Sequence, residues 1–399
     1  MNGLENITWF VVAVSALLGA LVGSFSNVLI YRIPRGESIA FPPSRCPSCG
    51  HRLGVLDLVP IFSWVALGGK CRYCGAPISS RYPLVETVSA LGYGLLAFYF
   101  PLEKVGIGLL GLFVLYTGLL VGSAVDLERK ELPDPITLGF LPVGLFFALL
   151  ADRSNASSLS VLPSFTGALE GAALGAGTLA LLGAYGSWLT RRFAEPRPIH
   201  PLGWMQMTLA ALVGTLLALF GVPLAALWGV GVAVLSSAVN FVLKRPVRYP
   251  DFVTLLGTLI LLVIGWILSA NNQLPVNMLS VLSSGTTAAG ATALLVGYYW
   301  WAAPEPAEED PEDTYSSDYG AMGFGDVKLM GMIGAFIGWT ATGIGMILAI
   351  FLGAVLGIAL YLRTKDRQVP FGPFLALGSL IALFYQGPLL EFLGSLFNV

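Results

Sequence analysis

Long apolar stretches dominate the pattern of hydrophobic and polar positions along the chain. Each is close to the roughly 20 residues that a helix needs to cross a bilayer. They lie at residues 9–30, 83–100, 105–125, 135–151, 165–189, 202–219, 222–242, 251–270, 277–302, 327–340, 342–362 and 371–387. Because lipid offers no partners to backbone N–H and C=O groups, the pattern predicts helices. We therefore expect an all-α polytopic membrane protein with about 12 transmembrane helices.

The composition agrees with this pattern. Of 399 residues, 56% are hydrophobic and only 11% are charged, against about 25% charged in a typical soluble domain. The mean hydropathy is +0.78. Residues 1–8 contain no Lys or Arg, whereas a secretory signal begins with basic residues. We expect the first apolar stretch to be a retained transmembrane helix.

Basic residues predict the orientation of the chain, because cytoplasmic loops are rich in Lys and Arg. If twelve helices alternate from an outside N-terminus, Lys104 and Arg153 fall on one side and the other 19 of the 21 basic residues on the opposite side. That opposite side should be the cytoplasm. A wrong helix count would scramble this bias, so the bias also supports the count.

Two polar segments interrupt the helices on the expected cytoplasmic side. Residues 31–82 contain all four cysteines, and the Pro-rich residues 303–321 contain an acidic run that should be a solvated loop without a catalytic role. The expected organisation is a first helix at 1–30, a cysteine loop at 31–82, helices two and three at 83–125, a catalytic module with candidate duplicated helices at 126–302, the acidic loop at 303–321 and C-terminal helices at 322–399.

The cysteines form two CxxC pairs. Cys46 and Cys49 are followed, after 21 residues, by Cys71 and Cys74, and a glycine follows each pair. Two such pairs can close a tetrahedral four-thiolate zinc site. Two disulfides are the alternative, which the reducing cytoplasm disfavours. A site with four protein ligands has no open coordination position, so we expect the zinc to be structural.

Three aspartates lie at predicted helix ends: Asp126, Asp134 and Asp326. An ionisable group at the membrane is costly and suggests a function. The alternative for each is a helix N-cap. This alternative suits Asp134, which opens a helix, better than Asp126, which closes one and opposes its dipole. Two carboxylates that share a site do not both ionise readily, so one can act as acid and the other as base on a water molecule. The chain has only two histidines, and neither lies near a nucleophile elbow.

Several short motifs follow one another along the chain. They are Gly23–Pro34, Pro42–Cys74, Ile78–Glu86, the segment from Asp126 to Leu132-Pro133-Asp134, Gly323-Phe324-Gly325-Asp326-Val327-Lys328, and Pro370-Phe371-Gly372-Pro373. Their kind and order resemble those of bifunctional type IV prepilin peptidase/N-methyltransferases, which are GxGD-type aspartic peptidases.

The resemblance implies an enzyme that cleaves the leader of type IV prepilins or pseudopilins and then methylates the new N-terminus with S-adenosylmethionine. It implies Asp126 and Asp326 as the catalytic pair, and the cysteine loop with the first helix as the part associated with methylation. Supporting roles are expected for Asp134, Gly323, Gly325 and Lys328. The residues that bind S-adenosylmethionine are unknown, since no Gly-rich nucleotide loop is present.

The resemblance also implies surroundings and partners. The chain should lie in the bacterial inner membrane, with the zinc loop and active site facing the cytoplasm, and serve type IV pilus assembly or type II secretion. Its expected partners are prepilin or pseudopilin N-terminal segments and the lipid bilayer. No nucleic-acid partner is expected.

The chain departs from the family in length. The family has about eight helices, whereas here 199 residues separate Asp126 from Asp326. The middle resembles a second copy of the catalytic module, displaced by 113 to 122 residues, or four helices. The matched segments are 123–126 with 237–240, 133–138 with 250–255, 180–185 with 293–298, and 202–204 with 324–326. Asn240 would then stand opposite Asp126, and Trp204 opposite Asp326. Chance similarity between Ala/Gly-rich helices is the alternative.

Three other functions fit parts of the pattern. Twelve helices with a parallel repeat would suit a transporter, but transporter sites lie near the bilayer midplane, whereas these carboxylates lie at its edge. A methyltransferase without peptidase activity would not need both aspartates. A zinc-anchored scaffold would leave the GFGD motif unexplained.

Overall fold

The computed structural model describes residues 2–153, 161–190, 202–243, 247, 251–302, 322–364 and 370–397. The long helices are α1 (Asn2–Arg32), α3 (Arg81–Tyr99), α5 (Gly108–Arg129), α6 (Asp134–Arg153), α7 (Phe165–Thr190), α8 (Trp204–Leu219), α9 (Ala225–Leu243), α10 (Asp251–Ala270), α11 (Met278–Ala302), α12 (Phe324–Thr364) and α13 (Gly372–Phe397). The short ones are α2 (Phe62–Ala66), α4 (Leu102–Val105) and the 3-10 turns η1 (Ile33–Arg35) and η2 (Val55–Asp57). Over these residues the only β-structure is two isolated bridges, so the all-α prediction is confirmed.

The helices match the apolar stretches with some changes at their ends. Within the described ranges, nine helices are long and apolar enough to cross a membrane, which makes the chain a multi-pass membrane protein. The stretches 327–340 and 342–362 both belong to α12, and the break between them falls at Gly338, whose φ of 72° interrupts the helix. Asp126 does not end its helix as predicted, because α5 continues to Arg129. The number of twelve spans stays a prediction.

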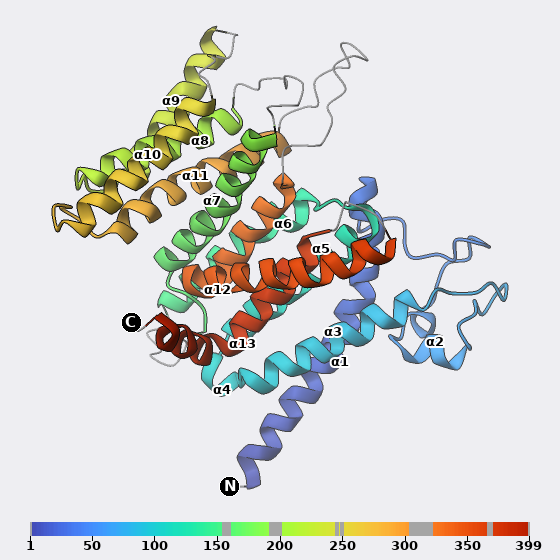
Figure 1. The fold of residues 1–399 in the computed structure, drawn as a ribbon. Coiled ribbons are helices and arrows are strands. Elements are labelled where there is room, and N and C mark those ends of the chain that lie inside the picture. The colour runs from blue at the N-terminus through green and yellow to red at the C-terminus, as the bar shows by residue number, and fades with distance from the viewer. Residues whose placement is uncertain are drawn as a thin grey trace.

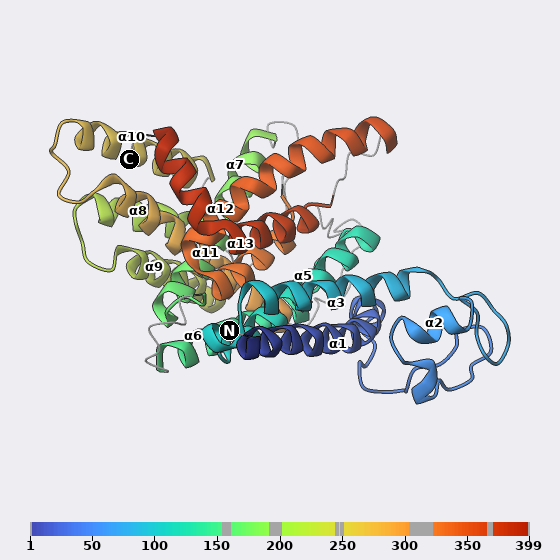
Figure 2. The same cartoon turned by 90° about the horizontal axis from the view of Figure 1, so that it is seen from below.

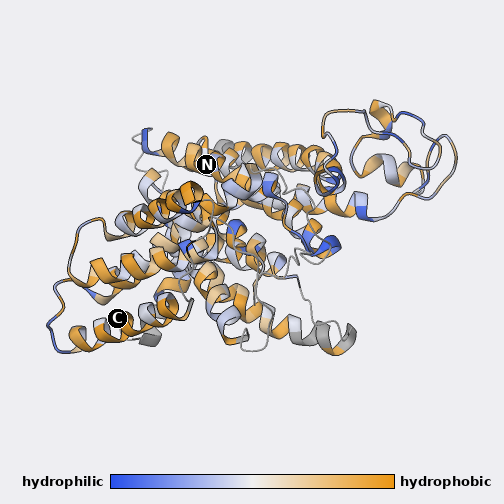
Figure 3. Cartoon of the chain, turned by 90° about the horizontal axis from the view of Figure 1, so that it is seen from above, coloured by the Kyte–Doolittle hydropathy of each residue, from blue (hydrophilic) through white to orange (hydrophobic). Residues whose placement is uncertain are grey.

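Three groups of helices lie side by side (Figure 1). Helices α8 to α11 lie on one side, α1 and α3 on the other, and α5, α6, α7, α12 and α13 between them. The largest core cluster is in this middle group, where Leu179 of α7 packs with Met330 and Phe336 of α12. The helices are apolar along most of their length, and polar residues gather in the loops (Figure 3).

The middle group meets α8–α11 through close packing of α7 against α11. Gly177 and Gly290 lie face to face there, and a Cβ on either would overlap the backbone of the opposite helix. Two tyrosines near the ends of these helices donate hydrogen bonds across the boundary. The hydroxyl of Tyr185 donates to the Leu255 carbonyl of α10 at 2.9 Å, and that of Tyr298 donates to the Leu138 carbonyl of α6 at 2.8 Å.

The cysteine loop projects beyond the ends of α1 and α3 (Figure 2). One hydrogen bond anchors it to α3: the Ile61 amide donates to the Glu86 carboxylate at 2.6 Å. A second bond closes the loop on itself, from the Trp64 indole N–H to the Ile78 carbonyl at 3.1 Å. Since Glu86 is buried, the base of the loop is fixed to the helix pair.

Candidate active site and metal centre

Asp126 lies in the last turn of α5, and only 5% of its surface is exposed. Its Oδ2 accepts a hydrogen bond from the Gly372 amide, at the first residue of α13, at 2.9 Å. A Cβ at position 372 would lie 2.8 Å from the same oxygen. The amide can reach the carboxylate because Gly372 has no side chain. The Pro370–Pro373 motif therefore contributes a contact to Asp126 that its sequence alone did not indicate.

Asp326 lies in the first turn of α12, where its amide donates to the Gly323 carbonyl at 3.2 Å. A Cβ on Gly325 would lie 2.9 Å from the Leu132 Cβ in the α5–α6 connection. The missing side chain thus lets the start of α12 approach the connection that follows Asp126. The two carboxylates, on α5 and α12, line the same cleft.

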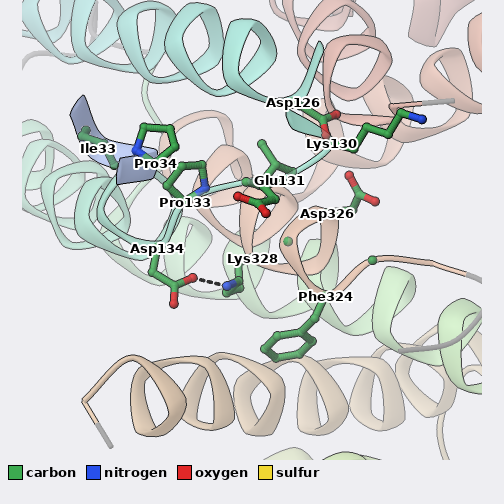
Figure 4. A pocket seen from close by; sticks show the side chains of 13 residues that line it. Ile33, Pro34, Asp126, Lys130, Glu131, Pro133, Asp134, Phe324, Asp326 and Lys328 are labelled. Carbon is green, nitrogen blue, oxygen red and sulfur yellow. Dashed lines mark hydrogen bonds and ion pairs between the residues drawn. The ribbon is translucent and has the colours of Figure 1, made fainter. Parts of the chain in front are cut away.

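Asp134 and Lys328 form an ion pair between the first turns of α6 and α12. Their side chains are 24% and 11% exposed, respectively. Asp134 is the first residue of α6, as expected, but its carboxylate pairs with Lys328 across the cleft (Figure 4). The pair joins the hairpin that carries Asp126 to the helix that carries Asp326.

These side chains line one cleft of about 480 Å³. Figure 4 shows both catalytic candidates facing it from different helices. Its lining residues are Ile33, Pro34, Asp126, Lys130, Glu131, Leu132, Pro133, Asp134, Gly323, Phe324, Gly325, Asp326 and Lys328. All the sequence-predicted carboxylates and their supporting residues therefore come together here. The cleft is also lined by η1, by the α5–α6 connection and by Phe324, which belong to the sequence motifs but were not predicted to be site residues.

The two residues that the repeat matches to the catalytic aspartates, Asn240 to Asp126 and Trp204 to Asp326, lie outside the cleft lining. Asn240 is buried, and its Oδ1 accepts a hydrogen bond from the Val247 amide at 2.8 Å. The Trp204 ring packs against Phe324 at a centroid distance of 5.7 Å. The acidic run at 303–321 and His200 lie outside the described residues, as does the side chain of Asp251.

The four cysteines converge as the CxxC spacing predicts. Their sulfur atoms all lie within 4.8 Å of one another, and those of Cys46 and Cys74 are 3.9 Å apart. Tetrahedral zinc with Zn–S bonds of about 2.3 Å needs sulfur atoms about 3.8 Å apart. All four thiols are free, so the disulfide alternative is not the state of this structure. The group fits a metal ion.

Backbone amides and crowding act on these thiols in opposite directions. Hydrogen bonds from the amides of Cys49 and Ser48 lower the pKa of Cys46 to about 6. At Cys74 the Ala76 amide also lowers the pKa, but burial and the neighbouring thiols outweigh it and raise the pKa to about 12. Four thiolates this close repel one another, and a divalent cation would remove that repulsion.

Comparison with known proteins covers both halves of the site. Residues 17–100 match the bacterial peptidase A24 N-terminal domain. Residues 248–358 match the type IV leader peptidase family. The second match includes Asp326 and Lys328 but begins after Asp126, which reaches Asp326 only through the fold.

Individual relatives are similar over shorter stretches. A "type 4 prepilin-like proteins leader peptide-processing enzyme" of Escherichia coli is 34% identical over 206 residues, which cover 43% of this chain and 74% of that protein. A "prepilin leader peptidase/N-methyltransferase" of Pectobacterium carotovorum is 33% identical over 222 residues, covering 45% and 75%. One of Myxococcus xanthus is 37% identical over 189 residues, covering 43% and 55%.

No solved structure matches the chain. The sequence matches nevertheless extend over most of the first two relatives at more than 30% identity. The two family-model matches contain the cysteine loop and the GFGD segment, which form the thiol cluster and part of the carboxylate cleft in the structure. The chain belongs to the type IV leader peptidase family.

Proposed function

We propose that this chain is a membrane aspartic endopeptidase that removes the leader of type IV prepilins or pseudopilins. One observation carries the proposal: Asp126 and Asp326, far apart in sequence, line the same cleft near the ends of their helices. The names of the relatives describe the same activity. Family membership favours this enzyme over a transporter or a scaffold.

The reaction follows from two carboxyl groups in one cleft. The ionised carboxylate takes a proton from a water molecule, whose oxygen attacks the scissile carbonyl carbon. The protonated carboxyl group gives its proton to the carbonyl oxygen. The tetrahedral intermediate then collapses, the C–N bond breaks, and the leaving amine takes up a proton. The water molecule supplies the OH of the new carboxyl group and, through the two carboxyl groups, the hydrogen of the new amine, so the reaction as written uses neither a metal nor a covalent nucleophile.

In this proposal Gly372 fixes the orientation of Asp126, and the Asp134–Lys328 pair fixes the start of α12. The glycines at 323 and 325 let α12 begin close to the α5–α6 connection. The charge bias supports a cytoplasmic position for the cleft and the cysteine loop. The chain would then thread twelve helices through the bacterial inner membrane.

The four cysteines would hold one structural Zn²⁺, since four thiolates leave no open coordination position. The name of the Pectobacterium relative also includes an N-methyltransferase, and we propose that this chain methylates the new N-terminus with S-adenosylmethionine as the methyl donor. We assign this second activity to the first helix and the cysteine loop, residues 1–82. Ile33 and Pro34 connect the loop to the peptidase cleft, so the cleaved end would emerge beside it.

The internal repeat is also part of the proposal: α5–α8 and the region from α9 to the first half of α12 are two parallel copies. The reciprocal tyrosine bonds support it, because the repeat exchanges Tyr185 with Tyr298 and Leu138 with Leu255. Contacts across the boundary are reciprocal too. Helix α12 packs on α7 and α6, and α8 packs on α11 and α10. The fourth helices are thus exchanged between the copies, which accounts for Asp326 reaching Asp126.

A cleavage assay tests the peptidase. The full chain, purified in detergent, is incubated with a prepilin-like substrate that has a basic leader and an apolar N-terminal helix. Wild type should cleave it, and Asp126→Asn and Asp326→Asn should each lose cleavage, while Glu103→Gln, an exposed carboxylate on α4, should keep it. Substantial cleavage by folded Asp126→Asn would refute the assignment.

A further inference from the structure

A proline in α6 creates a gap in the helix that carries Asp134. Pro142 lies inside α6 and has no N–H. The carbonyl of Leu138, four residues earlier, therefore lacks its usual helical donor. Leu138 is fully buried, and in lipid a freed carbonyl must find a donor within the protein. The Tyr298 hydroxyl supplies it from α11, at 2.8 Å.

The glycine next to this tyrosine brings α11 against both halves of the site. A Cβ on Gly297 would lie 3.3 Å from Cδ1 of Leu138 and 3.3 Å from Cδ of Lys328. Both distances are shorter than an ordinary van der Waals contact, so α11 lies directly against Leu138 of α6 and against the aliphatic part of the Lys328 side chain. Gly297 and Tyr298 thus contact the helices that carry the two partners of the Asp134–Lys328 pair.

This contact bears on the spacing of the two catalytic candidates. Asp134 lies one helical turn before Leu138, in the hairpin that carries Asp126. Lys328 lies two residues after Asp326. A shift of the first turn of α6 would move the ion pair, and with it the start of α12. Misplacement of about 1 Å at a catalytic group can reduce the rate about 100-fold.

From these contacts we propose that Tyr298 is a positioning residue for the Asp126–Asp326 pair. It acts from the second copy by giving α6 the hydrogen bond that Pro142 removes. The inference rests on the proposed peptidase function. The helices between Asp126 and Asp326 would then have a role in catalysis, because α11 holds the Asp134–Lys328 ion pair in place.

The repeat provides a matched control in Tyr185. Its hydroxyl donates to the Leu255 carbonyl at 2.9 Å, and both tyrosines are half-buried. The residue four positions after Leu255 is Leu259, which has an N–H, so that carbonyl does not depend on the tyrosine. Tyr185 also lies outside the cleft lining. Removing its hydroxyl takes away a similar bond without exposing a carbonyl next to the ion pair.

The experiment measures kcat and KM for a prepilin-like peptide with wild type, Tyr298→Phe and Tyr185→Phe, each purified as the full chain. Tyr298→Phe should lower kcat about ten-fold and leave KM unchanged, because the substrate is not contacted. Tyr185→Phe should keep both constants. An unchanged kcat for Tyr298→Phe, or equal losses for the two variants, overturns the proposal.

A rescue variant tests the physical cause. Pro142→Ala restores an N–H four residues after Leu138, so the double variant Tyr298→Phe/Pro142→Ala should recover kcat to within about three-fold of wild type. If Tyr298→Phe cannot be purified folded, this double variant is compared with wild type directly. A folded double variant that stays impaired overturns the proposal. Failure of the peptidase assignment is distinguishable, because wild type would then not cleave, or Asp126→Asn would.

Discussion

The ion pair between Asp134 and Lys328 leads to a quantitative prediction. Lys328→Met keeps the apolar stem but removes the ammonium group. A hydrogen bond to a charged group contributes about 1.5–3 kcal/mol. The two side chains are 24% and 11% exposed, so water weakens the pair somewhat, and we expect a coupling of about 1–2 kcal/mol. That corresponds to about a 5- to 30-fold loss of kcat/KM if the pair must be intact in the transition state.

A double-mutant cycle measures this coupling. Cleavage of a prepilin-like peptide is compared for wild type, Lys328→Met, Asp134→Asn and the double variant. The double variant should lose no more than either single variant, because both remove the same interaction. Arg72→Met is the control, since it breaks the Arg72–Asp57 pair in the cysteine loop and should leave cleavage unchanged. Additive losses in the cycle would refute the view that the two residues act as one unit.

Three further predictions follow from the thiol cluster, the α13 contact and the repeat. Metal analysis should find about one zinc per chain, and chelation should impair methylation before it impairs cleavage. A purified chain that contains no metal and still methylates would contradict this. Gly372→Ala should reduce cleavage at least about ten-fold, because its Cβ would displace the Asp126 carboxylate. Gly387→Ala in the same helix should be neutral, because a Cβ there would have no neighbouring atom within 4 Å; equal activities of the two variants would count against the contact. Asn240→Asp should not restore cleavage to Asp126→Ala, and recovery would mean that the second copy holds a working site.

Local chemistry explains which features the sequence predicted well. Helices are the only structures that long apolar stretches can form in lipid, so the all-α architecture follows from hydropathy alone. The two CxxC pairs predict a thiol cluster, because each pair already places two sulfur atoms on one short turn. Asp126, Asp134 and Asp326 stand out because charges are costly at a membrane. For each of them the sequence marked a single residue without showing its neighbours.

Contacts between distant segments depended on the tertiary structure. No local pattern says that Asp126 meets Asp326 across 199 residues, because that proximity results from α12 packing on α6 and α7. The Gly372 amide and the Tyr298 hydroxyl could not be anticipated either, since each reaches a partner on another helix. Hydropathy determines which segments enter the membrane, because transfer into lipid is a property of each segment by itself. Which helices then pack together depends on shape and on hydrogen bonds between them, and only the folded chain decides this.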